Sequence, residues 1–178
     1  ICCAPCANRP IAQLREEGHS VTGFWFNPNI HPYTEYQARK ATLEGYAKEI
    51  GMKLIIGGRY DLRSFITNVA DNIDGRCAYC YRVRMEETAK YAAEHGFDSF
   101  TTSLLISPYQ KHDAIAAIAR EMGQQYGVEF LYRDFRPLFR EGQEFAREHG
   151  FYMQKYCGCI FSEEERYMAA KWKKEAKR

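Results

Sequence analysis

The sequence of 178 residues contains no apolar run that approaches the ~20 residues of a membrane-spanning helix. Its first residues lack the basic-then-apolar pattern of a signal peptide. Charge is nearly balanced, with 25 Lys and Arg against 23 Asp and Glu, so no strong overall field indicates the charge of a partner. No glycine-rich phosphate loop or nicotinamide fingerprint is visible, which argues against ATP and dinucleotides. These absences predict a cytoplasmic protein that makes no membrane contact.

The residues that are present predict a single domain over residues 1–178. At 46% apolar and 15% aromatic, the chain can bury one substantial core. Apolar alternation predicts strands at 20–26, 52–58, 98–103 and 128–134. Periodic apolar positions predict helices at 33–51, 61–72, 77–95 and 115–127, with Gly51 and Gly96 as the stops of two of them. The remainder to the C-terminus is expected to be mostly helical.

Strands that alternate with helices predict an α/β fold, a parallel sheet with flanking helices. A loop that leads into a helix, as ANRPIAQLREEGH follows CCAPC, normally needs a strand before it, so the first strand is expected to precede Ile1. Parallel sheets place their sites at the carboxyl ends of the strands. The loops 27–32, 57–59 and 103–110 are therefore expected at the site, together with the opening cysteines.

Seven cysteines stand in three tight groups: Cys2, Cys3 and Cys6; Cys77 and Cys80; and Cys157 and Cys159. An odd number in local clusters fits a disulfide framework poorly, and a CxxC beside two further groups indicates a metal site. A redox dithiol and simple burial of the thiols are the alternatives.

Ligand counting favours more than one metal centre. A structural zinc ion takes four ligands, and a [4Fe–4S] cluster also takes four, so three of the seven thiols remain. Adjacent residues in an extended segment point to opposite sides, so Cys2 and Cys3 are expected to serve two neighbouring centres. Three thiolates on a second ion leave a tetrahedral position open, as in a catalytic metal site.

Five ordered blocks, CCAPC, NPNIHP with EYQ, GRCAYCYRVRMEETA, TTSLLISPYQ and YMQKYCGCIFS, resemble the cobalamin-independent epoxyqueuosine reductase family, QueH. The resemblance implies a Rossmann-like (HUP-like) fold, an iron–sulfur cluster with an additional metal ion nearby, and reduction of epoxyqueuosine to queuosine at the tRNA wobble position. The chain departs from the family in keeping only Ile1 of an apolar first strand. It also carries Cys6 where some members carry Asp, and both side chains can bind iron.

Reduction of an epoxide to an alkene removes one oxygen and consumes two electrons and two protons, and a metal with an open position is suited to polarise the departing oxygen. The cluster is expected to draw on Cys77, Cys80, one of Cys2 and Cys3, and one of Cys157 and Cys159. The second metal, expected to be iron, takes the others, with Cys6 included. Electrons must arrive from an external low-potential donor of the ferredoxin or flavodoxin type, because no organic cofactor motif is visible.

Polar residues near these groups are the candidates for the remaining chemistry. Besides Cys6, the candidates for a catalytic role are Tyr79, Tyr109, His112 and Asp113. Candidates for substrate contacts are Asn27, Asn29, Ser103, Ser107 and Gln110, with Arg82 and Arg84 as guides for an RNA phosphate. A packed tyrosine or a solvated helix start is the alternative interpretation of each catalytic candidate, and the basic tail KWKKEAKR is either an RNA contact or a solvated helix end.

Three classes of function remain open from the residues alone. The first is a tRNA-modifying reductase, and the second is an iron–sulfur electron carrier or a relative of the tRNA-thiolation enzymes. The third is a zinc-stabilised binding module. Thiolation enzymes of this architecture use a glycine-rich phosphate loop where CCAPC stands, which disfavours that relative.

Overall fold

The computed structural model describes residues 1–175 of the chain. Its helices are α1 (Ala4–Glu16), α2 (Tyr33–Glu49), α3 (Leu62–Val69), α4 (Arg76–Glu94), α5 (His112–Tyr126), α6 (Phe139–Glu148) and α7 (Ile160–Glu175). Its strands are β1 (Gly23–Trp25), β2 (Leu54–Ile56), β3 (Ser99–Phe100) and β4 (Glu129–Phe130). Short 3₁₀ turns lie at Ala70–Asn72, Ser103–Ile106 and Arg136–Leu138. The predicted mixture of helices and strands is confirmed, and helix dominates.

Within residues 1–175 the strands form two parallel pairs, β1 with β2 and β3 with β4. The predicted single parallel sheet is not observed there, and every strand is shorter than its apolar pattern suggested. The reason is visible at β1, where Trp25 is fully buried in the core and the chain then turns into the loop that leads to α2. Apolar residues at strand ends thus pack as loop residues instead of extending the ladder.

The backbone at Ile1 lies along the second edge of β1. Gly23 N–H and Trp25 C=O face β2, through hydrogen bonds with Lys53 and Gly57. Successive residues in a strand present their backbone groups to opposite edges, so the carbonyl of Phe24 faces away from β2. The Ile1 nitrogen donates to this carbonyl at 2.8 Å, which places the start of the CCAPC segment beside β1.

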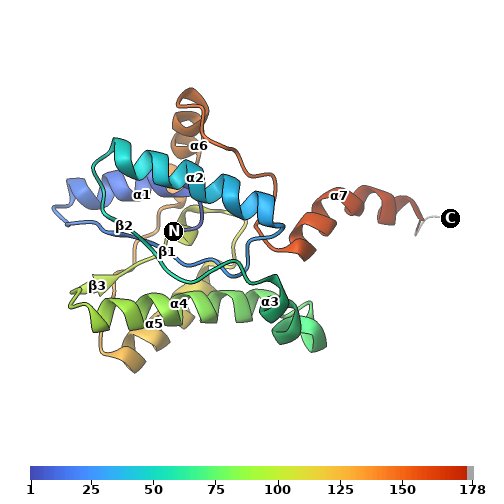
Figure 1. Cartoon of the computed structure of the whole chain (residues 1–178), viewed down its shortest axis with the longest axis horizontal. Coiled ribbons are helices and arrows are strands. Elements are labelled where there is room, and N and C mark those ends of the chain that lie inside the picture. Colours follow the sequence, from blue (N-terminus) through green and yellow to red (C-terminus); the bar gives the residue numbers. More distant parts are fainter. Residues whose placement is uncertain (176–178) are drawn as a thin grey trace.

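Figure 1 shows the labelled strands between α1 and α2 on one side and α4 and α5 on the other. α4 packs against α5 and α1 packs against α6. The core between these layers is built from residues such as Trp25, Leu43, Met85 and Ile115. Glycines in the left-handed region end α2 and α4, as predicted for Gly51 (φ 59°) and Gly96 (φ 69°).

The C-terminal part is helical, as predicted, but residues 151–159, which form neither helix nor strand, separate α6 from α7. Figure 1 shows α7 running away from the rest of the protein. None of the helices that the structure describes is long and apolar enough to cross a membrane. Residues 176–178, the end of the basic tail, lie outside the described part of the chain.

Candidate metal centre

The three N-terminal cysteines form a compact group at the start of α1. Cys3 is the N-cap residue, with extended backbone (φ −171°, ψ 157°), and the helix begins at Ala4 with Pro5 in its first turn. A side chain at the N-cap faces the third helical residue, which here is Cys6. The sulfurs of Cys2, Cys3 and Cys6 all lie within 4.8 Å of one another, and all three residues are buried. In the part of the chain that the structure describes, no other three potential metal ligands come as close together.

In an extended chain the side chains of Cys2 and Cys3 would point to opposite sides, but in the structure they do not. Cys2 Sγ lies 3.8 Å from Cys3 Sγ, because the chain bends into α1 directly after Cys3. Two thiolates bound at about 2.3 Å to one tetrahedral ion lie about 3.8 Å apart. The pair is therefore spaced to share a single ion.

Ionisation of this group is unevenly distributed. Hydrogen bonds from Cys3 and Cys6 hold the pKa of Cys2 well below its ordinary value. Burial raises the pKa of Cys3, and the hydrogen bonds to Cys2 and Cys3 raise that of Cys6. Metal binding displaces thiol protons, so three thiols this close together can act jointly as ligands of one cation.

The other four cysteines face the same space from different elements. Cys77 and Cys80 lie one turn apart in the first turns of α4, and Cys157 and Cys159 lie in the segment that leads into α7. These four, with Cys2 and Cys6, line one cleft of about 770 Å³. Cys3, at 1% exposure, lies behind the cleft wall. Three groups that are far apart in the sequence therefore meet at one site.

Buried positive charge accompanies these sulfurs. Arg84 is 4% exposed on α4, and its charge lies close enough to Cys80 to act on the pKa of that thiol. Although burial alone lowers its pKa, the Cys80 and Cys2 sulfurs raise it above the ordinary value. Burial raises the pKa of Cys80 to about 12, with the Arg84 charge opposing that rise. A buried guanidinium whose strongest partners are sulfurs favours a site in which those sulfurs are ionised, as they are when they bind metal.

Two glutamine amides donate to the thiols. Gln110 Nε2 donates to Cys157 Sγ at 3.1 Å, and Gln154 Nε2 donates to Cys3 Sγ at 3.1 Å and to Cys6 Sγ at 3.4 Å. N–H donors to sulfur stabilise thiolate ligands and lower the basicity of the sulfur. Seven thiols, several N–H donors and buried cationic charge together form a donor set suited to iron or zinc.

The cleft also contains polar atoms that have no partner. Asn29 Oδ1, Ser103 Oγ and Gln154 Oε1 are buried without a hydrogen bond, and all three residues line the cleft. Buried polar atoms are normally hydrogen-bonded, so unpaired ones in a cleft wall are positions where a ligand can supply the missing partner.

The structure brings part of the predicted site set into this cleft. Of the predicted catalytic and substrate-binding residues, those that line it are Cys6, Asn29, Ser103, Ser107, Tyr109 and Gln110. Tyr109 is 85% exposed at this position.

The other candidates lie elsewhere. Tyr79 packs against Phe65, and Asn27 donates to the Ile1 carbonyl at 2.8 Å. Arg82 forms an exposed ion pair with Glu121, and His112 hydrogen-bonds Tyr132 at 3.0 Å. None of these four residues lines the cleft, and neither does Asp113, an exposed residue in the first turn of α5. Arg84 is not among the lining residues either, but it contacts Cys80.

Sequence reasoning did not single out Arg39 or Gln154. Arg39 stands four residues after Glu35, a spacing that is typical of a solvated ion pair on a helix surface. Both residues are instead buried, with Glu35 at 6% and Arg39 at 1% exposure. Gln154 belongs to the block YMQKYC that precedes Cys157, and its nearness to a cysteine group was the one available signal.

Fold and site together define an α/β protein built around a thiol-lined cleft that has the donor set of a metal centre. The family model described as Epoxyqueuosine reductase QueH matches residues 1–165. The chain belongs to this family, which confirms the resemblance and the assignment as an oxidoreductase.

Curated relatives agree with the family match. The chain is 39% identical over 166 residues to the epoxyqueuosine reductase QueH of Dehalococcoides mccartyi, across 93% of this chain and 91% of that protein. It is 34% identical over 175 residues to the QueH of Thermotoga maritima, across 93% and 89% of the two chains. It is 31% identical over 190 residues to the QueH of Haemophilus influenzae, across 99% and 74%.

Proposed function

We propose that this chain reduces epoxyqueuosine to queuosine at the wobble position of tRNA, using an iron–sulfur cluster and an adjacent metal ion. The observation that carries the proposal is the convergence of the cysteine groups on one cleft whose wall also holds unpaired hydrogen-bonding atoms. A site of this kind has ligands for metal and polar positions for an organic substrate. Family membership supports the assignment.

The thiols divide by geometry into a group of three and a group of four. Cys2, Cys3 and Cys6 are spaced to bind one ion, which we propose to be iron, and three protein ligands leave one position open. Cys77, Cys80, Cys157 and Cys159 then remain as the four ligands of a [4Fe–4S] cluster. This division differs from the one predicted from sequence, which assigned one of Cys2 and Cys3 to the cluster. When bound, these groups supply electrons singly and Lewis acidity at the open position.

The cleft wall suits a modified nucleobase. The unpaired Asn29 Oδ1 and Gln154 Oε1 are free to accept hydrogen bonds, and the unpaired Ser103 Oγ is free to donate and accept. A base amine and the hydroxyls of a cyclopentane diol are groups that such atoms bind. We propose that these three residues hold the epoxide-bearing ring in the cleft, with the carbon skeleton of the substrate toward the cysteines.

The mouth of the cleft suits RNA. Four basic residues are among those that line the cleft: Lys111, Arg147, Lys155 and Arg166. They bring positive charge to the rim of the cleft, although the net charge of the whole chain is only +2. Such contacts position a phosphate backbone without reading its sequence. Tyr109 is exposed beside Phe139, with ring centroids 5.8 Å apart, and offers a face on which a base can stack. Tyr109 is also one of the catalytic candidates, as a donor of a proton. Substitutions at this position distinguish base stacking from proton donation.

The Rossmann-like arrangement belongs to the same proposal. Both strand pairs are parallel, helices lie on both sides of the strands, and the backbone at Ile1 runs beside the free edge of β1. We propose that the backbone at this edge and the two strand pairs belong to one parallel arrangement, so that the CCAPC segment enters the cleft from the carboxyl end of a strand. An external low-potential donor of the ferredoxin or flavodoxin type is proposed to supply the electrons.

The proposal is tested with anaerobically reconstituted protein whose iron and acid-labile sulfide have been quantified. Given a low-potential one-electron donor and tRNA that carries epoxyqueuosine, the protein is expected to form queuosine without added cobalamin, flavin or nucleotide. Mass spectrometry of the digested nucleosides detects a product that is lighter by one oxygen. A protein with an intact cluster that leaves epoxyqueuosine unchanged would contradict the reductase assignment, and zinc without sulfide would contradict the cluster.

A further inference from the structure

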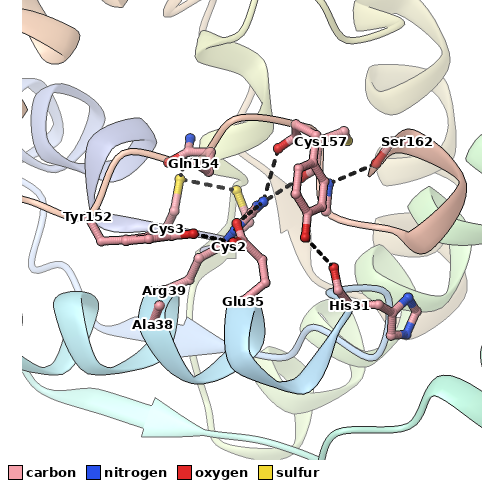
Figure 2. A network of polar contacts seen from close by, with 12 residues as sticks. Cys2, Cys3, His31, Glu35, Ala38, Arg39, Tyr152, Gln154, Cys157 and Ser162 are labelled. Atoms are coloured by element: carbon pink, nitrogen blue, oxygen red, sulfur yellow. Dashed lines mark hydrogen bonds and ion pairs between the residues drawn. The ribbon is translucent and has the colours of Figure 1, made fainter. Parts of the chain in front are cut away.

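Arg39 is the most buried charged residue near the thiols, at 1% exposure on the inner face of α2. Its guanidinium donates in three directions, as Figure 2 shows. Nε and Nη2 reach Glu35 Oε1, each at 2.7 Å, and Nη1 reaches the Cys157 carbonyl at 2.8 Å. Nη2 also donates to the Tyr156 carbonyl at 3.0 Å. One planar group thus joins a helix to two consecutive peptide carbonyls of the segment that carries Cys157.

Glu35 and the aromatic residues of this segment complete the arrangement. Tyr152 OH donates to Glu35 Oε2, so the carboxylate accepts from both the helix and the segment. The Arg39 guanidinium lies 5.7 Å from the centroid of the Tyr156 ring. Tyr156 OH donates to the His31 carbonyl at 2.7 Å, and His31 N–H donates to the Gly158 carbonyl at 2.7 Å. The segment is therefore fixed to α2 and to the loop before it along most of its length.

The opposite side of the same segment faces the N-terminal thiols. Gln154 donates to Cys3 and Cys6, while Cys157, three residues later, lines the cleft. Figure 2 shows the segment passing above Cys2 and Cys3, with Arg39 and Glu35 approaching from α2. A shift of this segment would move Cys157 and Cys159 relative to the other cysteines and break the contacts of Gln154.

We propose that Arg39 is a positioning residue, which fixes the Cys157–Cys159 loop so that the four ligands of the cluster stand ready beside the N-terminal group. This inference rests on the proposed metal site but not on the substrate. Arg39 lines the cleft, but all three of its guanidinium nitrogens donate to protein acceptors, namely Glu35 and the carbonyls of Tyr156 and Cys157. It acts by holding the peptide that carries two of the ligands, and Glu35 fixes the direction in which the guanidinium points.

The geometry requires arginine and not merely a positive charge. A guanidinium presents its N–H groups in a rigid planar fork, and here the fork serves one carboxylate and two carbonyls at once. A lysine ammonium cannot reach these acceptors with the same fixed directions. Residues that orient metal ligands typically contribute about 10–100-fold to metal affinity.

The test uses the full chain, reduced and metal-free, in four variants: Arg39→Lys, Arg39→Gln, Glu35→Gln and Lys40→Gln. Lys40 is the matched control, because it is the next residue on α2 and pairs with Glu44 at the surface. Two readouts are needed. Hydrogen–deuterium exchange reports order in residues 152–159, and Co²⁺ titration under anaerobic conditions reports affinity through the thiolate charge-transfer absorption.

Arg39→Lys, Arg39→Gln and Glu35→Gln are each expected to accelerate exchange in 152–159 selectively, while α4 and α5 keep their protection. The two Arg39 variants are expected to bind Co²⁺ about 10–100-fold more weakly, and Lys40→Gln is expected to match the wild type in both readouts. If Arg39→Gln fails to fold, the results for Arg39→Lys and Glu35→Gln are sufficient to test the proposal. Wild-type exchange in 152–159, unchanged Co²⁺ affinity, or faster exchange throughout the chain would overturn the proposal. Neither readout uses tRNA, so failure here is distinct from failure of the reductase assignment.

Discussion

Cys2 and Cys3 are neighbours in sequence, and their sulfurs lie 3.8 Å apart on the same side of the chain. With Cys6 they form the one tight group of thiols in the described residues, whereas Cys77, Cys80, Cys157 and Cys159 face the cleft from two other elements. The two proposed metal centres are therefore expected to be lost separately, because their ligands come from different parts of the fold.

Replacing Cys77 by Ser is expected to abolish the visible absorption of the cluster, because an iron then lacks its thiolate. Replacing Cys6 by Ser is expected to leave most of that absorption while turnover falls and the iron content drops by about one ion per chain. Anaerobic absorption spectra with iron and sulfide quantification check both variants. A colourless Cys6→Ser protein would assign Cys6 to the cluster.

Gly158, between Cys157 and Cys159, has a φ of +154°, a value that side chains with a Cβ rarely adopt. Gly158→Ala is therefore expected to lower the free energy of unfolding by about 1–3 kcal/mol. Gly45→Ala is the matched control, because Gly45 lies within α2 with open space where a Cβ would stand. Alanine there is expected to stabilise by about 0.5–1 kcal/mol. Urea unfolding of both variants measures the difference, and equal effects would contradict the role of φ.

His31 predicts an acid dependence of stability. Burial lowers the pKa of His31 from 6.5 to about 4, against the opposing hydrogen bond to the Pro28 carbonyl. Between these values the unfolded chain binds a proton that the folded chain does not, so the contribution of neutral His31 is present above pH 6.5 and is lost as pH falls toward 4.

From about pH 7 to about pH 5 this loss amounts to about 2 kcal/mol in the free energy of unfolding. Urea unfolding at the two pH values is expected to show a smaller loss for His31→Gln than for the wild type. His19→Gln, which replaces an exposed histidine, serves as the control. A His31→Gln protein with the full wild-type pH dependence would refute the assignment.

Two substitutions of Tyr109 distinguish base stacking from proton donation. Its ring is 85% exposed, so Tyr109→Ala is expected to leave stability within about 0.5 kcal/mol of the wild type. If the ring stacks on a base, Tyr109→Ala raises KM for tRNA about 5–150-fold, since stacking energies are about 1–3 kcal/mol per base, and Tyr109→Phe keeps the wild-type KM. Single-turnover and steady-state kinetics distinguish the roles, because loss of kcat in Tyr109→Phe would indicate proton donation by its hydroxyl.

Much of the scaffold was predictable because local signals set it. The periodicity of Tyr36, Leu43, Tyr46, Ala47 and Ile50 marked α2, and all but Ile50, which is half-buried at the C-cap, are buried. Gly51 ended the helix as its pattern indicated. Strand lengths were not predictable, since they depend on where a neighbouring backbone lies, and apolar residues in a buried loop have the same composition as those in a strand.

The three cysteine groups were expected to lie together and the structure brings them to one cleft, but the contacts between its parts could not be derived from the sequence. The approach of Cys2 to Cys3 follows from the bend at the N-cap, which the extended-chain argument did not include. Arg39 donates to the carbonyls of Tyr156 and Cys157, which stand 117 and 118 positions later in the chain. Tertiary packing decides whether a pair such as Glu35 and Arg39 faces solvent or the core, and spacing alone does not.

The hydrogen bond from Gln154 to Cys3 spans 151 positions of the sequence. During synthesis Cys3 is added 151 positions before Gln154, so at about 5–20 residues per second about 8–30 s separate the N-terminal thiols from the segment that covers them. Throughout this interval the three thiols have neither the amide of Gln154 nor the ligands Cys157 and Cys159 beside them. The proposed centre can thus be completed only after residues 154–159 have been translated, and until then the N-terminal thiols depend on a reducing environment.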